Sequence, residues 1–208
     1  KEVIQMYEEQ GDKVYLIPVG GSSPIGAAGY VMAAKEIKDQ LSDMNIKIDY
    51  IFTGFGSTGT FGGLYLGAKY FDAGFIPIGV SVSHKSDAEI QEKVDYIKET
   101  NKFLELGVDV NLEDMWIEKG YVGISYNVPD PETRKYVYMM AREEAIILDP
   151  CYTGKTFRGM IEMIQGGKIS KDSNIMLLHT GGAPGLFSEG HSEAMLGELW
   201  GEQKEFRL

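Results

Sequence analysis

The sequence predicts an α/β protein with an open, mostly parallel, twisted sheet and helices on both faces. Short β-rich runs alternate along the chain with longer runs whose apolar residues recur at helical spacing. The β-rich runs are continuously apolar, which is typical of strands buried on both faces. Glycine clusters follow three of these runs. In such sheets, ligands bind just beyond the carboxyl ends of the strands.

The expected elements follow from these patterns. Continuous apolar runs predict strands at 14–19, 49–53, 76–82 and 174–180, and the run 145–149 is strand-like. Helical spacing predicts helices at 26–41, 59–71, 87–106, 130–144 and 153–165. Ser86 is a typical N-cap for the third helix, and Pro131 suits the first turn of the fourth. Segment 107–129 has the weakest periodicity and is expected to be mostly loop.

Composition limits the class of protein. The 208 residues suffice for one large domain or two small ones, and no repeat or evident linker divides them, so 1–208 is expected to be one domain. The net charge of -11 argues against nucleic acid or an anionic membrane as a partner, because both need a basic face. No apolar run is long enough to span a bilayer, no secretory signal is visible, and the lone Cys151 fits a reducing cytosol. We therefore expect a cytoplasmic protein.

The beginning of the chain predicts a fragment. Its first ten residues, KEVIQMYEEQ, lack an initiator Met and read like the tail of an amphipathic helix that is already under way.

The stretch TGFGSTGTFGGL, residues 53–64, is the first candidate site. Its five glycines after a strand do not form a Walker A loop, which needs Lys-Ser/Thr at its end. A GxGxxG spelling is present, but no convincing Asp or Glu follows about 20 residues later, as a dinucleotide site requires. The backbone N–H groups of Ser57 to Thr60 could instead converge on a phosphate at a helix N-terminus, with the Ser57 and Thr60 hydroxyls as further donors. We favour this phosphate site over a turn whose glycines serve only close packing.

The segment DPCYTGKTFRGM, residues 149–160, is the second candidate. It places Tyr152 where a strand-like run meets a helix, and a tyrosine there can stack on a flat ring, move a proton, or simply line the rim of the core. Cys151 is expected to be a small buried hydrophobe. Lys155 and Arg158 are expected to be solvated or next to the phosphate, without a depressed pKa.

Weaker signals lie elsewhere. The glycine turn at 20–26 reads better as turn and cap chemistry than as a site. Thr180 ends an apolar strand before two glycines, so its hydroxyl could donate to a ligand at the sheet edge. His84, His179 and His191 have no metal-like spacing and are expected at the surface or at caps, so no metal site is predicted.

Taken together, these segments resemble the C-terminal part of the D-cysteine desulfhydrase and 1-aminocyclopropane-1-carboxylate (ACC) deaminase family. That family belongs to the pyridoxal 5'-phosphate (PLP) enzymes of the tryptophan-synthase-β fold, also called fold type II. The similarity runs from about Lys13 to the C-terminus in the family's order and spacing. It is carried by the motifs YLIPVGGSSPIGAAGYV, TGFGSTGTFGGL, SYNVPDPE, ILDPCYTGKTFRGM and LLHTGGAPGLF.

The resemblance implies a role for each matching residue. The glycine loop would hold the PLP phosphate, Tyr152 would lie near the cofactor ring, and Tyr126 would face the substrate. Thr180 would lie close to the pyridine nitrogen. The implied cofactor-binding set is Gly56, Ser57, Thr58, Gly59, Thr60, Thr153, Thr180 and Gly181, with Tyr126 and Tyr152 as the catalytic pair.

Three departures from the family pattern matter. ACC deaminases have Glu directly after the tyrosine of the DPxY segment, where this chain has Thr153 as desulfhydrase-like members do. A neutral hydroxyl makes the ring a weaker electron sink, which favours β-elimination over opening of a cyclopropane. Asn127 replaces a common Gly after the second tyrosine. No lysine lies where the family's Schiff-base lysine would match, and neither Lys85 nor Lys155 is nominated in its place.

The resemblance therefore implies the PLP-cradling large domain of a lyase, without the upstream lysine segment and the small domain. The implied reaction converts a small amino acid, D-cysteine, to pyruvate, ammonia and sulfide, in an enzyme that is expected to be a homodimer. The isolated chain is expected to bind the PLP phosphate weakly at most and to be inactive. ACC deaminase and L-cysteate sulfo-lyase remain alternatives within the enzymes, and a non-catalytic Rossmann-like phosphate- or nucleotide-binding module is the alternative from another class.

Overall fold

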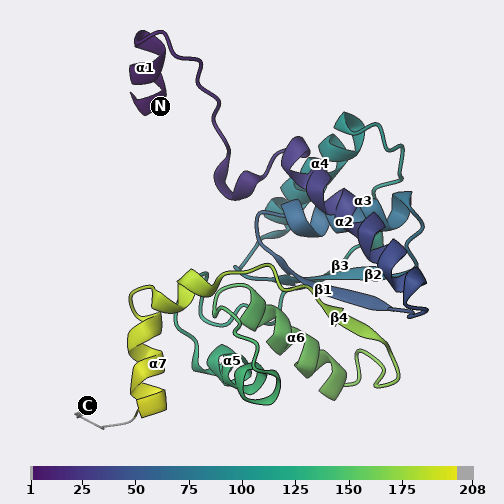
Figure 1. Ribbon diagram of the computed structural model, residues 1–208, viewed down its shortest axis with the longest axis vertical. Coiled ribbons are helices and arrows are strands. Elements are labelled where there is room, and N and C mark those ends of the chain that lie inside the picture. Colours follow the sequence, from purple (N-terminus) through teal and green to yellow (C-terminus); the bar gives the residue numbers. More distant parts are fainter. Residues whose placement is uncertain (1, 201–208) are drawn as a thin grey trace.

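The structure, a computed structural model, describes residues 2–200 and contains a parallel four-stranded sheet (Figure 1). The strand order is β3-β2-β1-β4, and every pairing is parallel. The strands are β1 (Tyr50–Phe55), β2 (Ile76–Ser81), β3 (Trp116–Glu118) and β4 (Ile175–Leu177). The predicted α/β class with a parallel sheet is confirmed. Residues 1 and 201–208 of the expected domain lie outside the described residues.

Helices cover both faces of the sheet, as predicted. One layer holds α2 (Pro24–Asp43), α3 (Gly59–Tyr70) and α4 (Asp87–Phe103), and the other holds α5 (Pro131–Glu144) and α6 (Thr153–Gln165) (Figure 1). Ser86 caps α4 in a reciprocal capping box with Glu89, and Pro131 is the first residue of α5. These five helices match the predicted ranges to within a few residues at their ends.

The central strand divides its side chains between the two layers. Ile51 packs with Leu64 and Phe55 packs with Phe61, both on the side of α3. Phe52 packs with Met163 of α6 on the opposite side. Successive strand residues point to opposite faces, so a strand that is apolar throughout is covered on both faces.

The sequence was wrong about several shorter elements. Residues 14–19 form no strand; 14–18 are extended, Val19 begins a short 3-10 helix, and the segment is mostly exposed and paired with no strand among the described residues. Their β-rich composition shows only that they suit a sheet, and a strand also needs a neighbour that supplies the ladder of hydrogen bonds. Residues 145–149 likewise form no strand, and the strand expected at 174–180 shortens to β4. Segment 107–129 is mostly loop, as expected, and it also contains the short edge strand β3.

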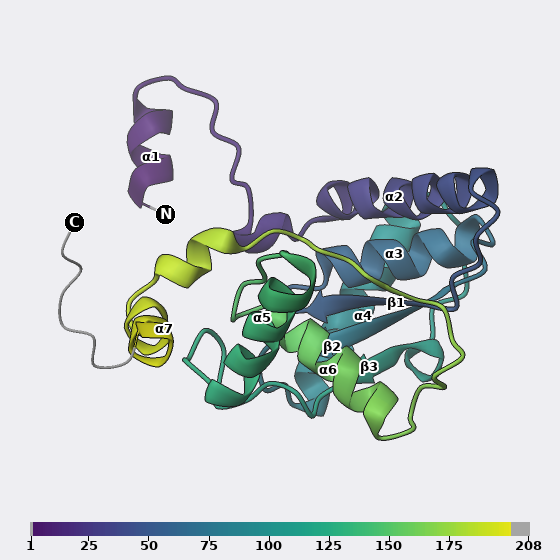
Figure 2. The ribbon, with the colours of Figure 1, turned by 60° about the horizontal axis from the view of Figure 1, so that its bottom comes forward.

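The two ends of the described chain carry further helices. α1 (Glu2–Glu9) is a helix, as its amphipathic pattern predicted, and it stands away from the sheet at the end of the extended arm (Figures 1 and 2). None of its residues is buried. α7 (His191–Trp200), which the sequence analysis missed, lies beside α5 after a short 3-10 helix, η3 (Ala183–Phe187) (Figure 2).

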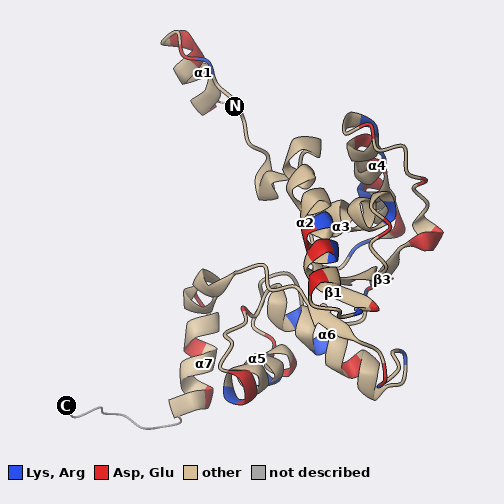
Figure 3. Ribbon diagram, turned by 45° about the vertical axis from the view of Figure 1, so that its right-hand side comes forward, with Lys and Arg blue, Asp and Glu red and all other residues tan. Residues whose placement is uncertain are grey.

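Charge is spread over the outer helices. Lys and Arg are interspersed with Asp and Glu along α2, α4 and α6, so none of these three helices forms a basic stripe (Figure 3). No helix between residues 2 and 200 is long and apolar enough to cross a membrane. In the same part of the chain, no group of three or more His, Cys, Asp or Glu residues is placed to hold a metal ion.

Candidate functional site

A pocket of about 280 Å³ lies at the carboxyl ends of β1 and β4. Three loops that are distant in the sequence meet there: the turn before α2, the β1–α3 loop, and the segment after β4, with the start of α6 close by. Its lining consists of Gly20, Tyr30, Thr53, Gly54, Gly56, Ser57, Thr60, Tyr152, Thr180, Gly181 and Gly182. The pocket therefore brings together predicted residues from the glycine loop, the DPCY segment and the HTGG segment.

The β1–α3 loop presents an open helix N-terminus to this pocket. Thr58, the N-cap of α3, has a left-handed backbone with φ 84°, and no side chain caps the helix. The first backbone N–H groups of a helix have no partner within it, so those at the start of α3 remain free for an anion. The hydroxyl-bearing side chains of Ser57 and Thr60 line the pocket beside them. The arrangement is chemically suited to a phosphate or carboxylate.

Two buried hydroxyls near this loop lack a protein partner. The Oγ1 atoms of Thr53 and Thr58 are inaccessible and form no hydrogen bond within the described structure. Thr53 also lines the pocket. Buried polar groups are nearly always satisfied, so the unpaired hydroxyl of the pocket-lining Thr53 indicates a site that gains a hydrogen bond when a polar ligand is bound.

The glycines of the loop serve two different purposes. A Cβ at Gly63 would lie 2.5 Å from the Cβ of Tyr30, and one at Gly62 would lie 2.8 Å from Cγ1 of Ile97, so these two permit helix packing. A Cβ at Gly54 or Gly56 would instead meet the ring of Tyr152, at 3.8 and 3.5 Å. Close packing thus explains the end of the motif, whereas its beginning gives the Tyr152 ring a bare backbone to lie against.

Tyr152 and Tyr126 form a pair. Their hydroxyls share a hydrogen bond, and their rings meet edge to face with centroids 5.8 Å apart. Partial burial and then the hydrogen bond with Tyr126 raise the pKa of Tyr152, so its phenol stays protonated at neutral pH. A protonated phenol at a pocket wall can donate to a ligand and hold a proton there.

The backbone at Asn127 accounts for one departure from the family pattern. Asn127 has φ 54°, in the left-handed region that glycine adopts freely and asparagine tolerates best among other residues. Asn can therefore replace Gly without moving the adjacent Tyr126.

His191 corrects a prediction. It was expected at the surface or at a cap, yet its side chain is fully buried and its Nε2 donates to the backbone oxygen of Asn127 at 3.2 Å. Its Nδ1 has no hydrogen-bond partner within the described residues. Burial lowers the pKa of His191, and the charges of Arg134 and Lys155 lower it further. His191 thus anchors the start of α7 to the loop that carries Tyr126.

Lys155 corrects a second prediction. The sequence suggested a solvated or phosphate-adjacent lysine, but the side chain is fully buried and lies outside the pocket lining. Its Nζ donates to the backbone oxygens of Val82 at 3.1 Å and Ser125 at 2.8 Å. Burial lowers its pKa, contrary to the expectation of an unperturbed lysine. Lys155 therefore joins the end of β2 to the residue before Tyr126.

Arg158 is neither free in solvent nor near the pocket. It pairs with Asp130 at 3.1 Å and with Glu162 at 2.8 Å. Cys151 is buried, as expected of a small hydrophobe, and burial raises its pKa.

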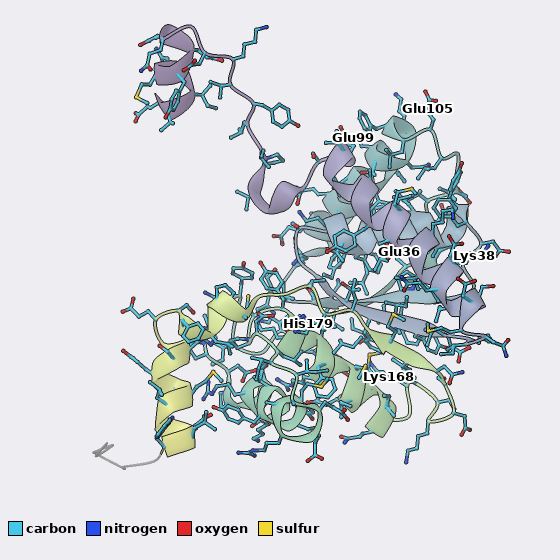
Figure 4. The ribbon with its side chains drawn as sticks, in the orientation of Figure 1. Glu36, Lys38, Glu99, Glu105, Lys168 and His179 are labelled. Atoms are coloured by element: carbon cyan, nitrogen blue, oxygen red, sulfur yellow. The ribbon has the colours of Figure 1, made fainter. Side chains whose placement is uncertain are left out.

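Thr153 is a predicted cofactor residue that does not line the pocket. It is buried, and its Oγ1 donates to Oδ1 of Asp149 at 2.7 Å while accepting from the Asp149 backbone N–H at 2.8 Å. Thr180 and Gly181, by contrast, line the pocket. His179, two residues before Gly181, accepts from its N–H through Nδ1 at 3.2 Å and is exposed on the segment between β4 and η3 (Figure 4).

The placement of the predicted site residues is therefore mixed. Those that line the pocket are Gly56, Ser57, Thr60, Tyr152, Thr180 and Gly181. Thr58 and Gly59 lie in the same loop without lining the pocket, and Tyr126 reaches it through Tyr152. Sequence analysis missed Thr53 and Tyr30. Thr53, at the end of an apolar strand, was a recognisable signal, whereas nothing in the local pattern singles out Tyr30.

The turn at 20–26 serves both as a helix cap and as part of the pocket wall. Ser23 caps α2 by accepting from the Gly26 N–H at 3.3 Å, as predicted, and Pro24 opens the helix. Gly20 of the same turn nevertheless lines the pocket.

Comparison with known proteins identifies relatives of this arrangement. Residues 1–181 match the family model described as pyridoxal-phosphate dependent enzyme. A D-cysteine desulfhydrase of Yersinia enterocolitica is 37% identical over 187 residues, which are 90% of this chain and 56% of that protein. A Thermotoga maritima protein provisionally named 1-aminocyclopropane-1-carboxylate deaminase is 38% identical over 185 residues, 89% of this chain and 57% of its own length.

A solved structure described as an ACC deaminase homologue superposes with a TM-score of 0.79 at 33% identity. The match covers 94% of this chain and 57% of that one. The chain thus spans little more than half the length of the proteins it matches.

Proposed function

This chain belongs to the pyridoxal-phosphate-dependent enzyme family, and on that premise we propose that its pocket holds PLP in a lyase that acts on D-cysteine. One observation carries the proposal. The uncapped N-terminus of α3, with Ser57 and Thr60 beside it, faces the same pocket as Tyr152 and Thr180. An anion site and a wall for a flat ring in one cavity match a cofactor that has a phosphate at one end and a pyridine ring at the other.

The residues present fit that cofactor. The free N–H groups at the start of α3 and the unpaired hydroxyl of Thr53 are donors that a phosphate or a ring substituent can use. Gly54 and Gly56 lie beside the Tyr152 ring, which an added Cβ would approach to 3.8 and 3.5 Å. Thr180 lines the pocket and would offer the ring nitrogen a neutral hydroxyl rather than a carboxylate.

When bound, PLP serves as the electron sink for the pair that remains after the amino acid loses its α-proton. The glycine loop binds and orients the phosphate. Tyr152 covers one side of the pocket, excludes water there, and carries a phenol proton at neutral pH, as any tyrosine does; burial raises its pKa further. The Tyr126 hydroxyl is hydrogen-bonded to that of Tyr152, so the two phenols form a donor pair on the side of the substrate. The net reaction combines D-cysteine with one water and gives pyruvate, ammonia and hydrogen sulfide.

ACC deamination is the second candidate, because relatives of both names match the chain equally well. In the sequence, Thr153 was the residue that favoured D-cysteine over ACC as the substrate. Its hydroxyl is bound to Asp149 outside the pocket, so it bears on the ring nitrogen less directly than the family pattern implied. Substrate preference therefore rests on Thr180 and the tyrosine pair.

The cofactor's lysine is proposed to come from a part of the enzyme beyond these 208 residues. No lysine is among the pocket-lining residues of the described chain. Lys155, which is buried, is engaged by two carbonyl oxygens.

The test uses the longer enzyme and the chain together. Pyruvate release is measured in parallel from D-cysteine, ACC and L-cysteate with the full-length protein. Release from D-cysteine supports the proposal, whereas release only from ACC supports the second candidate. The 208-residue chain is titrated calorimetrically with PLP and with pyridoxal, which lacks the phosphate.

A phosphate site predicts that PLP binds and that pyridoxal binds at least about tenfold more weakly, the effect of ~1.4 kcal/mol. Thr60→Ala should weaken PLP binding, whereas Ser42→Ala, at an exposed position of α2, should not. Equal binding of PLP and pyridoxal would remove the phosphate cradle from the proposal.

A further inference from the structure

Asp149 holds a buried carboxylate directly behind the pocket. Its side chain is almost fully buried and does not line the pocket. Oδ2 accepts from the backbone N–H groups of Cys151 and Tyr152, both at 2.7 Å. Oδ1 accepts from the N–H of Thr153 at 2.8 Å and from its Oγ1 at 2.7 Å. Four donors therefore satisfy one carboxylate.

Helix capping alone does not explain this set of bonds. α6 begins at Thr153, so the N–H groups of Cys151 and Tyr152 belong to residues before the helix. A capping side chain normally satisfies donors inside the first turn. Asp149 instead binds the N–H groups of the turn that precedes α6, and this turn places the Tyr152 ring at the pocket.

The same carboxylate also supports a second part of the pocket wall. Gly182 has φ 99°, and a Cβ there would lie 2.6 Å from both Cγ and Oδ1 of Asp149. The backbone of Gly182 therefore packs directly on the carboxylate. Gly182 lines the pocket together with Thr180 and Gly181. One side chain thus sits between the Tyr152 turn and the 180–182 segment.

We propose that Asp149 is a positioning residue whose carboxylate sets the separation between Tyr152 and the 180–182 segment. The inference rests on the proposed function in so far as that separation accommodates the PLP ring. The charge matters because a carboxylate accepts at both oxygens, whereas an asparagine amide accepts at only one. Asp149→Asn keeps the shape and removes two of the four accepted hydrogen bonds.

The first readout needs no ligand. Hydrogen exchange followed by mass spectrometry is measured on peptides that cover 150–154 and 178–186. Asp149→Asn should speed exchange in both peptides, because losing the carboxylate loosens both walls. Faster exchange in 150–154 alone would overturn the proposal and leave Asp149 as a local turn residue.

The second readout is binding. Asp149→Asn should weaken PLP binding about tenfold through the loss of hydrogen bonds to a charged acceptor. Inorganic phosphate, which needs only the α3 N-terminus, should bind as it does to the parent chain. If the parent chain binds PLP and Asp149→Asn binds PLP with the same affinity, the positioning role is overturned and the proposed function is left intact. Failure of the parent chain to bind either ligand counts against the proposed function, and the exchange experiment still decides the role of Asp149.

Asp130→Asn is the matched control. Asp130 is also buried and also caps a helix, accepting from the Glu132 N–H and from Thr133 Oγ1, but neither these partners nor Arg158, which also donates to it, line the pocket. It should lower stability without changing exchange in 178–186 or PLP affinity. If Asp149→Asn fails to fold, Gly182→Ala is used instead, because it perturbs the contact between Gly182 and the Asp149 carboxylate from the side of Gly182. It should speed exchange in 150–154, and unchanged exchange there would overturn the proposal.

Discussion

The hydroxyl of Tyr152 is hydrogen-bonded to that of Tyr126, which lies 26 residues earlier on a separate loop. The two rings are nearly perpendicular, at 81°. Each phenol is partly exposed, so the bond joins two pocket-side groups rather than two core groups. The pair depends on buried side chains behind it: Asp149 under Tyr152, and Lys155 and His191 on either side of Tyr126.

The tyrosine bond predicts non-additive mutants. Tyr126→Phe or Tyr152→Phe should each lower the free energy of unfolding by about 0.5–1.5 kcal/mol, the usual net value of one hydrogen bond. The double variant should cost no more than the larger single effect, because both partners are then gone. Urea unfolding measures all three, with the exposed Tyr15→Phe as a control. Fully additive losses would show that the two hydroxyls do not interact.

Lys155 predicts a rise in stability at alkaline pH. Its pKa is lowered in the folded state, so between that value and the unfolded value of about 10.4 the unfolded chain holds a proton that the folded chain has released. Stability therefore increases as pH rises through this window. The burial penalty applies in full below the folded pKa.

Lys155→Met should remove this rise, which urea unfolding at a series of pH values detects as a difference from the parent chain. Burial also lowers the pKa of Lys85, so Lys85→Met is the control that keeps the contribution of Lys155. Parallel pH profiles for Lys155→Met and the parent would contradict the buried, charged lysine.

His191 predicts a loss of stability in weak acid. Its folded pKa lies below the unfolded value of about 6.5, so the unfolded chain gains a proton first as pH falls. The stabilisation is present above the unfolded pKa and is lost as pH falls through the folded pKa. His191→Gln should flatten this part of the profile relative to His84→Gln, which alters an exposed histidine. If the loss of stability in weak acid persists in His191→Gln, groups other than His191 cause it.

The sequence predicted best those features that depend on local pattern. The apolar runs at β1 and β2 are each flanked by turn signals, and the capping residues Ser86 and Pro131 mark helix starts through chemistry contained within one turn. The glycine loop was recognised because a strand, glycines and a helix follow one another along the chain. In these cases, the physical cause and the sequence signal lie within a few residues of each other.

Features that depend on distant partners could not be read in this way. Lys155 lies in a motif with Arg158, yet only the positions of Val82 and Ser125 decide that the lysine is buried. The family resemblance implied that Tyr126 and Tyr152 both lie in the active site, but neither it nor any local pattern predicted the hydrogen bond between them. Residues 14–19 have the composition of a strand, but no neighbouring strand pairs with them in the described structure. His191 was expected at the surface or at a cap because its neighbours in the sequence are polar. Its burial comes from the packing of α7, which the local sequence does not show.

The glycine loop gives the last prediction, which separates packing from binding. Gly63 lies against α2, where an added Cβ would come within 2.7 Å of the Ala27 backbone oxygen. Gly63→Ala should therefore lower the free energy of unfolding by about 1–3 kcal/mol through overpacking, despite alanine's better helix propensity. Gly29→Ala in α2 is the matched control. Nothing lies within 4 Å of its added methyl, so it should raise stability by up to about 1 kcal/mol.

Gly56→Ala tests the other purpose of the loop. Its Cβ would lie 3.3 Å from Val82 and 3.5 Å from the Tyr152 ring, contacts that small shifts can relieve. Its stability loss should thus be smaller than that of Gly63→Ala, while its loss of PLP affinity, measured by calorimetry, should be larger. The reverse order would mean that the beginning of the motif serves packing and its end serves binding. The expected order follows from position alone: Gly56 borders the pocket, and Gly63 lies one helical turn beyond it, against a neighbouring helix.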